Sequence, residues 1–353
     1  MLKEKIKSWN NPVIKKLLFT RRLFKDENFA SWVNDYDTCN TIVKFEELGK
    51  ENQEKVLFFI EFNQPEFGFF AYWKFGLAAI AFAERYGFVP VIDWTDQGPY
   101  YVDSGIDGKT NPFEYFFDPI TEIRIQEARK SFNVVFANPR TYRNIALRYE
   151  EDKDLNLFSN LVKKYYVLRE PLKIRLDNEI EKLLNDKKTL GIQIRGVDWG
   201  NIEGHPIPPS LEKYVEEIDK AIAQCGFEQI FLATDAEETV EFISNKYPNK
   251  VVVYKDVARA PKGSKTLAIF DNNIKRENNG FLLGYEVLRD MLTLASCQGL
   301  VASYSNVSFA TEVTKKSWDA EFEYKHIIKA DINKKGMSSE KAIKLQKQGK
   351  FKG

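Results

Sequence analysis

In the first half of the chain, short apolar runs alternate with longer amphipathic stretches. Strand-length runs that are apolar almost throughout occur at residues 56–62, 89–94 and 133–137. Continuous apolar runs of this length are typical of strands buried on both faces. Between the first two, residues 71–87 predict a largely buried helix that ends at Gly87. Residues 155–187 predict mainly helix with a break near Pro171.

The second half repeats this alternation more clearly. Strands are expected at 190–195, 229–235, 250–256 and 299–303, and helices at 210–226, 236–247 and 280–297. Ser210 is the expected N-cap of the first of these helices. Strands separated by helices predict an α/β fold with parallel sheets covered on both faces. We expect two Rossmann-like domains that face a central cleft, at residues 1–180 and 181–330, followed by a basic tail at 331–353.

Charge is distributed unevenly along the chain. The formal net charge of the whole chain is +1, whereas residues 1–25 carry +7 and residues 331–353 carry +5, so the remainder carries −11. A balance this close to neutral argues against a general nucleic-acid binder. The basic ends predict either solvated tails, which we favour, or peripheral contact with the anionic inner face of a membrane.

Cysteine use and hydropathy exclude other classes. Cys39, Cys225 and Cys297 are widely spaced, which indicates neither a disulfide framework nor a zinc site. The first residues have no apolar core followed by a cleavage site, and the longest apolar stretch is interrupted by Lys74 and is too short to cross a bilayer. We therefore expect a cytoplasmic protein.

Polar side chains follow the ends of several expected strands in the second half. Arg195 ends the first strand, Asp235 ends the second, and residues 303–306 (SYSN) follow the last. Ligands of open parallel sheets bind at the carboxyl ends of the strands. A guanidinium there suits a phosphate or diphosphate, and the hydroxyls and backbone amides of 303–306 could hold a second phosphate oxygen. The alternative for Arg195 is an ion pair with Asp198.

Three further residues are candidates with open alternatives. Glu203 follows Arg195 by eight residues and could act as a general base, although a loop glutamate is usually solvated. His205, before a proline, is expected to fix the loop. Asp290 lies in an apolar helical stretch, where it either accepts paired N–H donors of a ligand or pairs with a nearby basic residue.

Motifs typical of metal or nucleotide binding are almost absent from the sequence. The chain has no GxxxxGK[ST] and no GxGxxG after a strand, and it holds two histidines more than a hundred residues apart. Asp35 and Asp37 form a DxD pair, but it precedes the first expected core strand and such pairs arise often by chance. We expect no metal and no cofactor.

Three stretches together resemble one family. IQIRGVDW (192–199), FLATDAEE (231–238) and LRDMLTLASCQGLVASYSNVS (288–308) are similar, in order and spacing, to the three motifs of the superfamily of α1,6-fucosyltransferases, Nod-factor fucosyltransferases and protein O-fucosyltransferases. Residues 68–94 look like the glycine loop, helix and strand that open these enzymes. The resemblance implies a GT-B fold and an inverting, metal-independent transfer from GDP-fucose.

The resemblance also assigns roles to residues. Arg195 would bind the β-phosphate of the leaving GDP, Asp290 the guanine edge, and Glu203 would be the catalytic base. The donor-binding set it implies is Gly68, Phe69, Gln193, Arg195, Asp198, Asp235, Asp290, Ser305 and Asn306, with Trp199 and His205 in support.

The sequence departs from the family pattern at three positions. Gln193 stands in place of the usual histidine, Gly196 in place of the second arginine of the α1,6-enzymes, and Ala236 in place of the second aspartate of L-A-T-D-D. At the position after Asp198, Trp199 resembles the protein O-fucosyltransferases more than the α1,6-enzymes. Three functions therefore stay open: transfer of fucose to a glycan, with lipid-linked glycans among the acceptors, GT-B transfer from another nucleotide sugar, and a catalytically silent nucleotide-sugar-binding protein.

Overall fold

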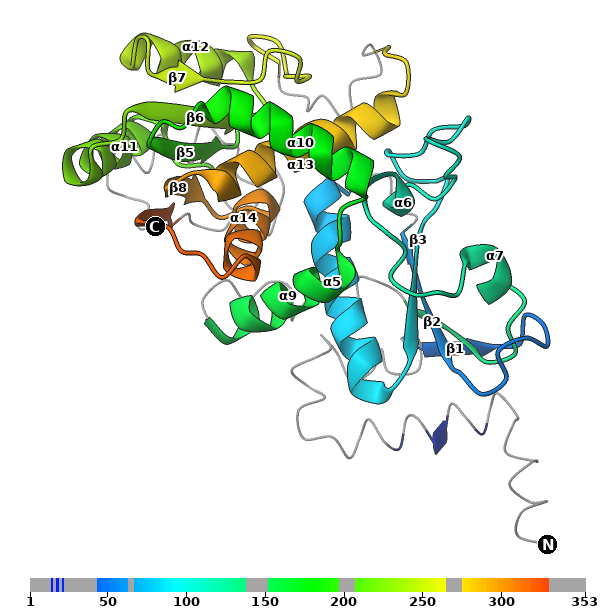
Figure 1. Cartoon of the computed structure of the whole chain (residues 1–353). Helices are drawn as coiled ribbons and strands as arrows, with labels where there is room; N and C mark the ends of the chain where they lie inside the picture. The colour runs from blue at the N-terminus through cyan, green and yellow to red at the C-terminus, as the bar shows by residue number, and fades with distance from the viewer. Residues whose placement is uncertain are drawn as a thin grey trace, which may run out of the picture. The chain divides into compact units, whose positions relative to one another are not determined.

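The chain folds into two α/β units, each built on its own β-sheet (Figure 1). The computed structural model describes residues 43–62, 67–137, 152–196, 207–264 and 275–329, together with positions 14, 17, 18 and 21. The units are Met1–Arg169 and Glu170–Gly353. The expected α/β class is confirmed, and the cleft expected between the two domains stays a prediction.

The first unit contains a four-stranded sheet in the order β1-β4-β2-β3. Its strands are β1 (Val43–Glu46), β2 (Leu57–Phe62), β3 (Val89–Trp94) and β4 (Val134–Ala137). Strands β2, β3 and β4 run parallel, as expected, because helical crossovers join them. The edge strand β1 pairs antiparallel with β4, so this sheet is mixed rather than parallel throughout.

Helices of the first unit are α5 (Phe69–Tyr86), α6 (Phe113–Phe116), α7 (Ile125–Ala128) and α9 (Asp152–Tyr165). Helix α5 is buried along almost its whole length, which explains why its sequence is apolar on every side. It ends at Gly87, whose φ of 72° lies in the left-handed region that glycine adopts without strain. The expected helix and its glycine stop are therefore confirmed.

The second unit contains a five-stranded sheet in the order β7-β6-β5-β8-β9, parallel throughout. Its strands are β5 (Thr189–Ile194), β6 (Gln229–Thr234), β7 (Val251–Val252), β8 (Gly299–Ser303) and β9 (Tyr324–Ile328). Successive strands move outward from β5 to β7, and the chain then returns to the other side of β5 to form β8 and β9. The strand order thus reverses between β5 and β8, which is the switch point of a doubly wound sheet.

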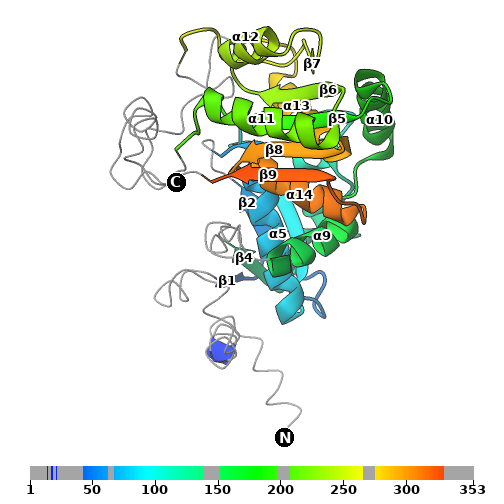
Figure 2. The same cartoon turned by 90° about the vertical axis from the view of Figure 1, so that its left-hand side faces the viewer.

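Helices cover both faces of this sheet (Figure 2). They are α10 (Glu170–Leu184), α11 (Leu211–Cys225), α12 (Glu237–Lys246), α13 (Asn279–Ser296) and α14 (Asn306–Ser317). In Figure 2, α11 crosses the near face of the sheet, whereas α13 and α14 lie behind it. A parallel sheet needs this double cover because its strands are apolar on both faces.

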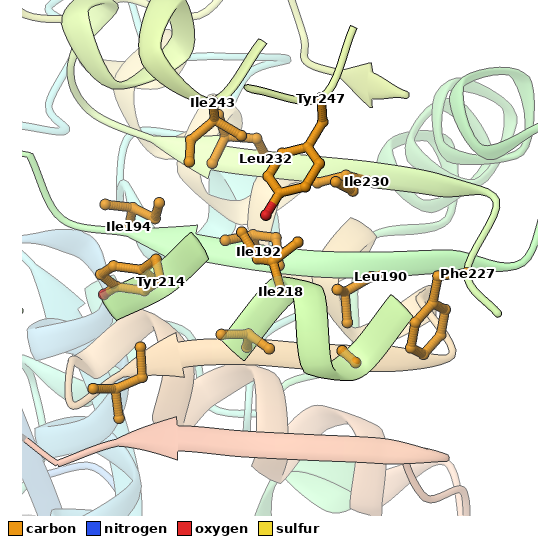
Figure 3. Packing of buried hydrophobic residues seen from close by; sticks show 13 residues of the cluster. Leu190, Ile192, Ile194, Tyr214, Ile218, Phe227, Ile230, Leu232, Ile243 and Tyr247 are labelled. Atoms are coloured by element: carbon orange, nitrogen blue, oxygen red, sulfur yellow. The ribbon is translucent and has the colours of Figure 1, made fainter. Parts of the chain in front are cut away.

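The face under α11 and α12 is a core of branched aliphatic side chains (Figure 3). Leu190, Ile192 and Ile194 of β5 point into it, since alternate residues of a strand share one face. They meet Tyr214 and Ile218 of α11, and each side chain of this kind contributes about 1.5–3 kcal/mol when fully buried.

The opposite face lies against α13. Gly191 of β5 faces this helix, and a Cβ at that position would lie 3.1 Å from Leu294 Cδ2 and 3.3 Å from Cys297 Sγ. Cys297 is fully buried, and its thiol donates to the carbonyl oxygen of Thr293 at 3.2 Å. The missing Cβ of Gly191 therefore lets α13 pack closely on β5 at this point.

The division between the units falls at Arg169 and Glu170, rather than near residue 180. Helix α10 belongs to the second unit because it packs on α13, where Glu179 accepts a 2.6 Å hydrogen bond from Arg289. The expected tail at 331–353 lies outside the described residues.

Candidate functional site

Polar side chains gather at the carboxyl ends of β5, β6 and β8, beside the switch point. Strand β5 pairs in register with both neighbours, with Ile194 opposite Thr234 and Gln193 opposite Ala302. The residues that follow these strands therefore leave the sheet at one edge. This is the edge where ligands of open α/β sheets bind.

One carboxylate holds the end of β5. Arg195 Nε lies 3.3 Å from Asp235 Oδ2, and the backbone N–H of Gly196 donates to Asp235 Oδ1 at 2.6 Å. The side chains of Arg195 and Asp235 are each 23% exposed. Asp235 thus fixes both the guanidinium and the backbone after it, while part of the cation stays accessible to a ligand.

Two of the departures from the family pattern are in contact with each other. A Cβ at Gly196 would lie 2.4 Å from the Cβ of Ala236 and 3.2 Å from both Asp235 Oδ1 and Thr239 Oγ1. Real Cβ atoms do not approach this closely. No side chain fits at 196 on this backbone, so an arginine there is incompatible with the observed start of α12.

Ser305 begins α14 and connects it to β5. Its hydroxyl accepts the N–H of Ser308 at 3.0 Å, and the Ser308 hydroxyl in turn accepts the N–H of Ser305, which makes a reciprocal cap. The Ser305 hydroxyl also donates to Oε1 of Gln193 at 3.0 Å, and both side chains are only 4% exposed. Gln193 therefore orients the first turn of α14. Asn306 is the first residue of that turn, and free backbone N–H groups at a helix start point along the axis, a geometry that suits an anion.

Asp290 lies on α13 and is 7% exposed. Its Oδ1 atom is buried and has no hydrogen-bond partner within the described ranges. Burial raises the pKa of Asp290 to about 7, against the lowering effect of Arg259 and Arg289. Among the described residues this oxygen forms no ion pair with Arg259 or Arg289. Arg259 donates to backbone carbonyl oxygens and the Nη atoms of Arg289 donate to other carboxylates, while Arg289 Nε is buried without a hydrogen-bond partner.

Gly68 and Phe69 belong to the first unit and are not in the same unit as the other candidates. Gly68 is the N-cap of α5, with open space where a Cβ would stand. Phe69 is 2% exposed, and its ring packs edge-on against Trp94 and Phe116 at centroid distances of 5.2 and 5.0 Å. Its side chain is thus part of the core of that unit, and the donor-binding role of Gly68 and Phe69 stays a prediction.

The remaining candidates, Asp198, Trp199, Glu203 and His205, lie outside the described residues. Their roles stay predictions. Asp35 and Asp37 lie outside them as well.

Several residues of the site have no counterpart in the sequence analysis. Arg259 is buried after β7, and its Nε and Nη2 groups donate to the carbonyl oxygens of Thr234 and Tyr254. Tyr214 of α11 is buried, and burial raises the pKa of its hydroxyl. Arg259 lies in a loop without any periodic pattern, and only its place shortly after a strand could have marked it.

In the described part of the chain, no group of three or more metal-ligating side chains lies close enough together to hold a metal ion. Within the same residues, no helix combines the length and apolar character needed to span a membrane.

Comparison with known proteins gives structural similarities only. No protein-family model matches the chain, and no curated protein matches it. Among solved structures, it is similar to NodZ α-1,6-fucosyltransferase soaked with GDP-fucose, at 16% identity over 74% of this chain and 92% of that one, with a TM-score of 0.44. It is similar to the fucosyltransferase NodZ from Bradyrhizobium at the same identity and coverage, with a TM-score of 0.42. It is also similar to POFUT1 in complex with GDP, at 12% identity over 78% of this chain and 74% of that one, with a TM-score of 0.34.

Proposed function

We propose that the chain is an inverting glycosyltransferase that transfers fucose from GDP-fucose to a hydroxyl group of a glycan. One observation carries this proposal. Arg195 lies at the switch point of a parallel sheet, where Asp235 forms an ion pair with its guanidinium and accepts the backbone N–H of the next residue. A fixed cation at this position fits a diphosphate.

The positive groups at this edge of the sheet suit the departing GDP. Negative charge grows on GDP as the bond from the sugar to the β-phosphate breaks, and donors fixed in advance stabilise that charge by several kcal/mol. Arg195 supplies a guanidinium, and the first turn of α14 supplies backbone N–H groups. Because Ser305 is bonded to Gln193, the helix start is held in place before any ligand arrives.

The reaction is a single displacement at the anomeric carbon. The acceptor oxygen forms a bond to this carbon while the bond to the β-phosphate oxygen breaks, and the electron pair of that bond leaves with GDP. Glu203 takes the acceptor proton, a role that comes from the family resemblance and is worth about 10²–10⁴-fold in rate. No metal and no cofactor takes part in the proposed reaction.

A second candidate is transfer from another GDP-sugar. The contact between Gly196 and Ala236 favours it, because both positions depart from the family pattern and the close packing excludes a second arginine there. Contacts to the sugar then differ from those of the α1,6-enzymes, while the diphosphate contacts of Arg195 stay the same. A catalytically silent binding protein would bind the nucleotide and turn nothing over.

Nucleotide selectivity tests the guanine donor that these functions share, and the product of transfer then separates them. Thermal shift with GDP, GDP-fucose and UDP is expected to raise the unfolding temperature for the two guanine nucleotides alone. A panel of GDP-sugars, with glycan acceptors that include lipid-linked ones, then identifies the donor by the mass of the product. Stabilisation by UDP but not by GDP would contradict the assignment of a guanine donor.

Two variants test the mechanism. Arg195→Ala is expected to weaken GDP binding and to abolish transfer, whereas Arg195→Lys, which keeps the charge but not the planar fork, retains part of the binding. Glu203→Gln is expected to leave GDP affinity nearly intact and to slow transfer. Unchanged turnover in Glu203→Gln would remove it as the base.

A further inference from the structure

The carboxyl group of Asp290 is buried in the second unit, and no described residue donates a hydrogen bond to its Oδ1. A buried carboxylate that lacks hydrogen-bond donors is costly, because nothing replaces the water it has lost. Proteins normally avoid that cost by pairing the charge or by keeping the group protonated.

Arg259, the first of two nearby cations, is engaged with the backbone. It comes from the segment after β7, and its side chain is 3% exposed. Its Nε donates to the carbonyl oxygen of Thr234 at 3.2 Å and its Nη2 to that of Tyr254 at 2.9 Å. The third nitrogen, Nη1, faces Glu237 at 3.8 Å. Arg259 thus lowers the energy of an ionised Asp290 through space only.

Arg289, the second cation, is engaged with other carboxylates. It lies next to Asp290 on α13 and donates to Asp256 at 2.6 and 3.1 Å and to Glu179 of α10 at 2.6 Å. Negative charge also faces Asp290 from Asp256 and from Glu286, one turn earlier on α13. The Nη atoms of Arg289 are therefore committed to Asp256 and Glu179, while its Nε is buried without a hydrogen-bond partner among the described residues. Glu286 is paired with Arg276.

Burial is the largest effect on Asp290, and it raises the pKa to about 7. The arginines act in the opposite direction, while Glu286 and Asp256 add to the increase. In the free protein at neutral pH, the group is therefore divided about equally between its two protonation states.

The chemistry of the proposed base contact requires one of these states. A guanine edge presents a ring N–H and an adjacent amine, and only an ionised carboxylate offers acceptors to both. A protonated carboxyl would set its own O–H against one of these N–H groups. Resting on the guanine assignment above, we propose that binding of the donor's base at Asp290 releases the proton that this carboxyl group holds in the free protein.

This coupling makes donor affinity depend on pH. Below neutrality, part of the binding energy is spent on removing the proton, whereas above it the carboxylate is already formed. With a free-protein pKa of about 7, the dissociation constant of GDP-fucose is expected to be about tenfold higher at pH 6 than at pH 8.

Titration calorimetry in two buffers of different ionisation enthalpy counts the protons released. GDP-fucose is the probe, because its diphosphate is esterified at both ends and does not titrate in this range. At pH 6.5 proton release is expected for each molecule bound, and at pH 8.5 it should be much smaller. The wild-type chain alone gives this result, so no variant has to fold for the test to be decisive.

Asp290→Asn is the matched control, because asparagine has nearly the same shape and cannot ionise. It is expected to bind GDP-fucose more weakly and without proton release at either pH. Measurable binding without proton release in the wild type would overturn the coupling and leave the donor proposal standing. Proton release that persists in Asp290→Asn would overturn Asp290 as its source. Absence of binding at every pH would instead overturn the donor proposal, and the coupling with it.

Discussion

The contact between Gly196 and Ala236 predicts that alanine at 196 destabilises the second unit. A Cβ at 196 would lie 2.4 Å from the Ala236 Cβ, and neither atom can rotate away. Two further contacts, to Asp235 Oδ1 and Thr239 Oγ1, would be 3.2 Å. Forcing a methyl group into a packed site typically costs about 1–3 kcal/mol. For a unit of this size, each kcal/mol lowers the unfolding temperature by about 2–4 °C.

A second substitution identifies the cause. Ala236→Gly removes the atom that the new Cβ would meet, and glycine is at least as good an N-cap as alanine at the start of α12. The double variant is therefore expected to recover about 1 kcal/mol or more relative to the sum of the two single changes. Such a coupling energy arises only if the two positions touch.

Thermal unfolding of the two single variants and the double variant measures this coupling. Gly68→Ala is the control, because its φ is −68° and no atom lies within 4 Å of the added Cβ. This control is expected to change stability by less than about 0.5 kcal/mol. The reasoning fails if Gly196→Ala unfolds at the wild-type temperature, or if Ala236→Gly does not restore it.

Further predictions concern the cap, the buried acid and the ion pair. Ser305→Ala and Ser210→Ala each remove an N-cap, so each is expected to lower the free energy of unfolding by about 1 kcal/mol. Only Ser305→Ala should also weaken GDP binding in a nucleotide titration. Equal GDP affinities of the two variants would contradict the role of the α14 start. Because the pKa of Asp290 is raised by folding, its contribution to stability is present at low pH and is lost as pH rises through about 7. Asp290→Asn should therefore gain in unfolding temperature relative to wild type between pH 6 and pH 8, and a constant difference would contradict this. Asp235→Asn keeps an oxygen for the backbone N–H of Gly196 but removes the negative charge that faces Arg195. In steady-state assays kcat is expected to fall more than KM changes. The free energy of unfolding is expected to change by about 1 kcal/mol or less. An effect on KM alone would instead indicate that Asp235 contacts the donor.

Strands buried on both faces were predictable from the sequence, and half-exposed edge strands were not. The expected strands at 89–94 and 299–303 have the observed bounds of β3 and β8. The edge strands β1 and β9 went unrecognised because sequences such as YKHII, with polar residues among the apolar ones, leave their side chains only partly buried. Strand β7 pairs over two residues instead of the seven expected at 250–256.

The boundary between the units coincides with the break in the helical pattern near Pro171, which the sequence alone did not identify as a boundary. The sequence indicated helix over 155–187 with a break near Pro171. The structure has two helices there, α9 and α10, and Pro171 is the second residue of α10, where its missing N–H is tolerated. The break marks the passage from one unit to the other. Helical periodicity alone cannot show this, because it does not identify the partner of each helix.

The part of the candidate site that lies at the ends of strands was predictable from the sequence. Arg195 and Asp235 meet because the register of parallel strands brings their ends together. The Ser305 bond to Gln193 depends on the side-chain geometry of the α14 cap, and the network around Asp290 joins residues separated by up to 110 positions. No local pattern encodes such contacts, since they form only when the helices pack.

Cys297 gives the second unit an internal reporter of its own opening. Burial raises the pKa of its thiol, and the group lies where the end of α13 packs against Gly191 of β5. Only the thiolate attacks an alkylating reagent, so Cys297 does not react while α13 stays packed on the sheet. The rate of alkylation at Cys297, with unfolded chain as reference, therefore measures how often α13 lifts from the sheet. Comparing that rate with and without GDP would show how strongly a ligand at the strand ends closes the core below it.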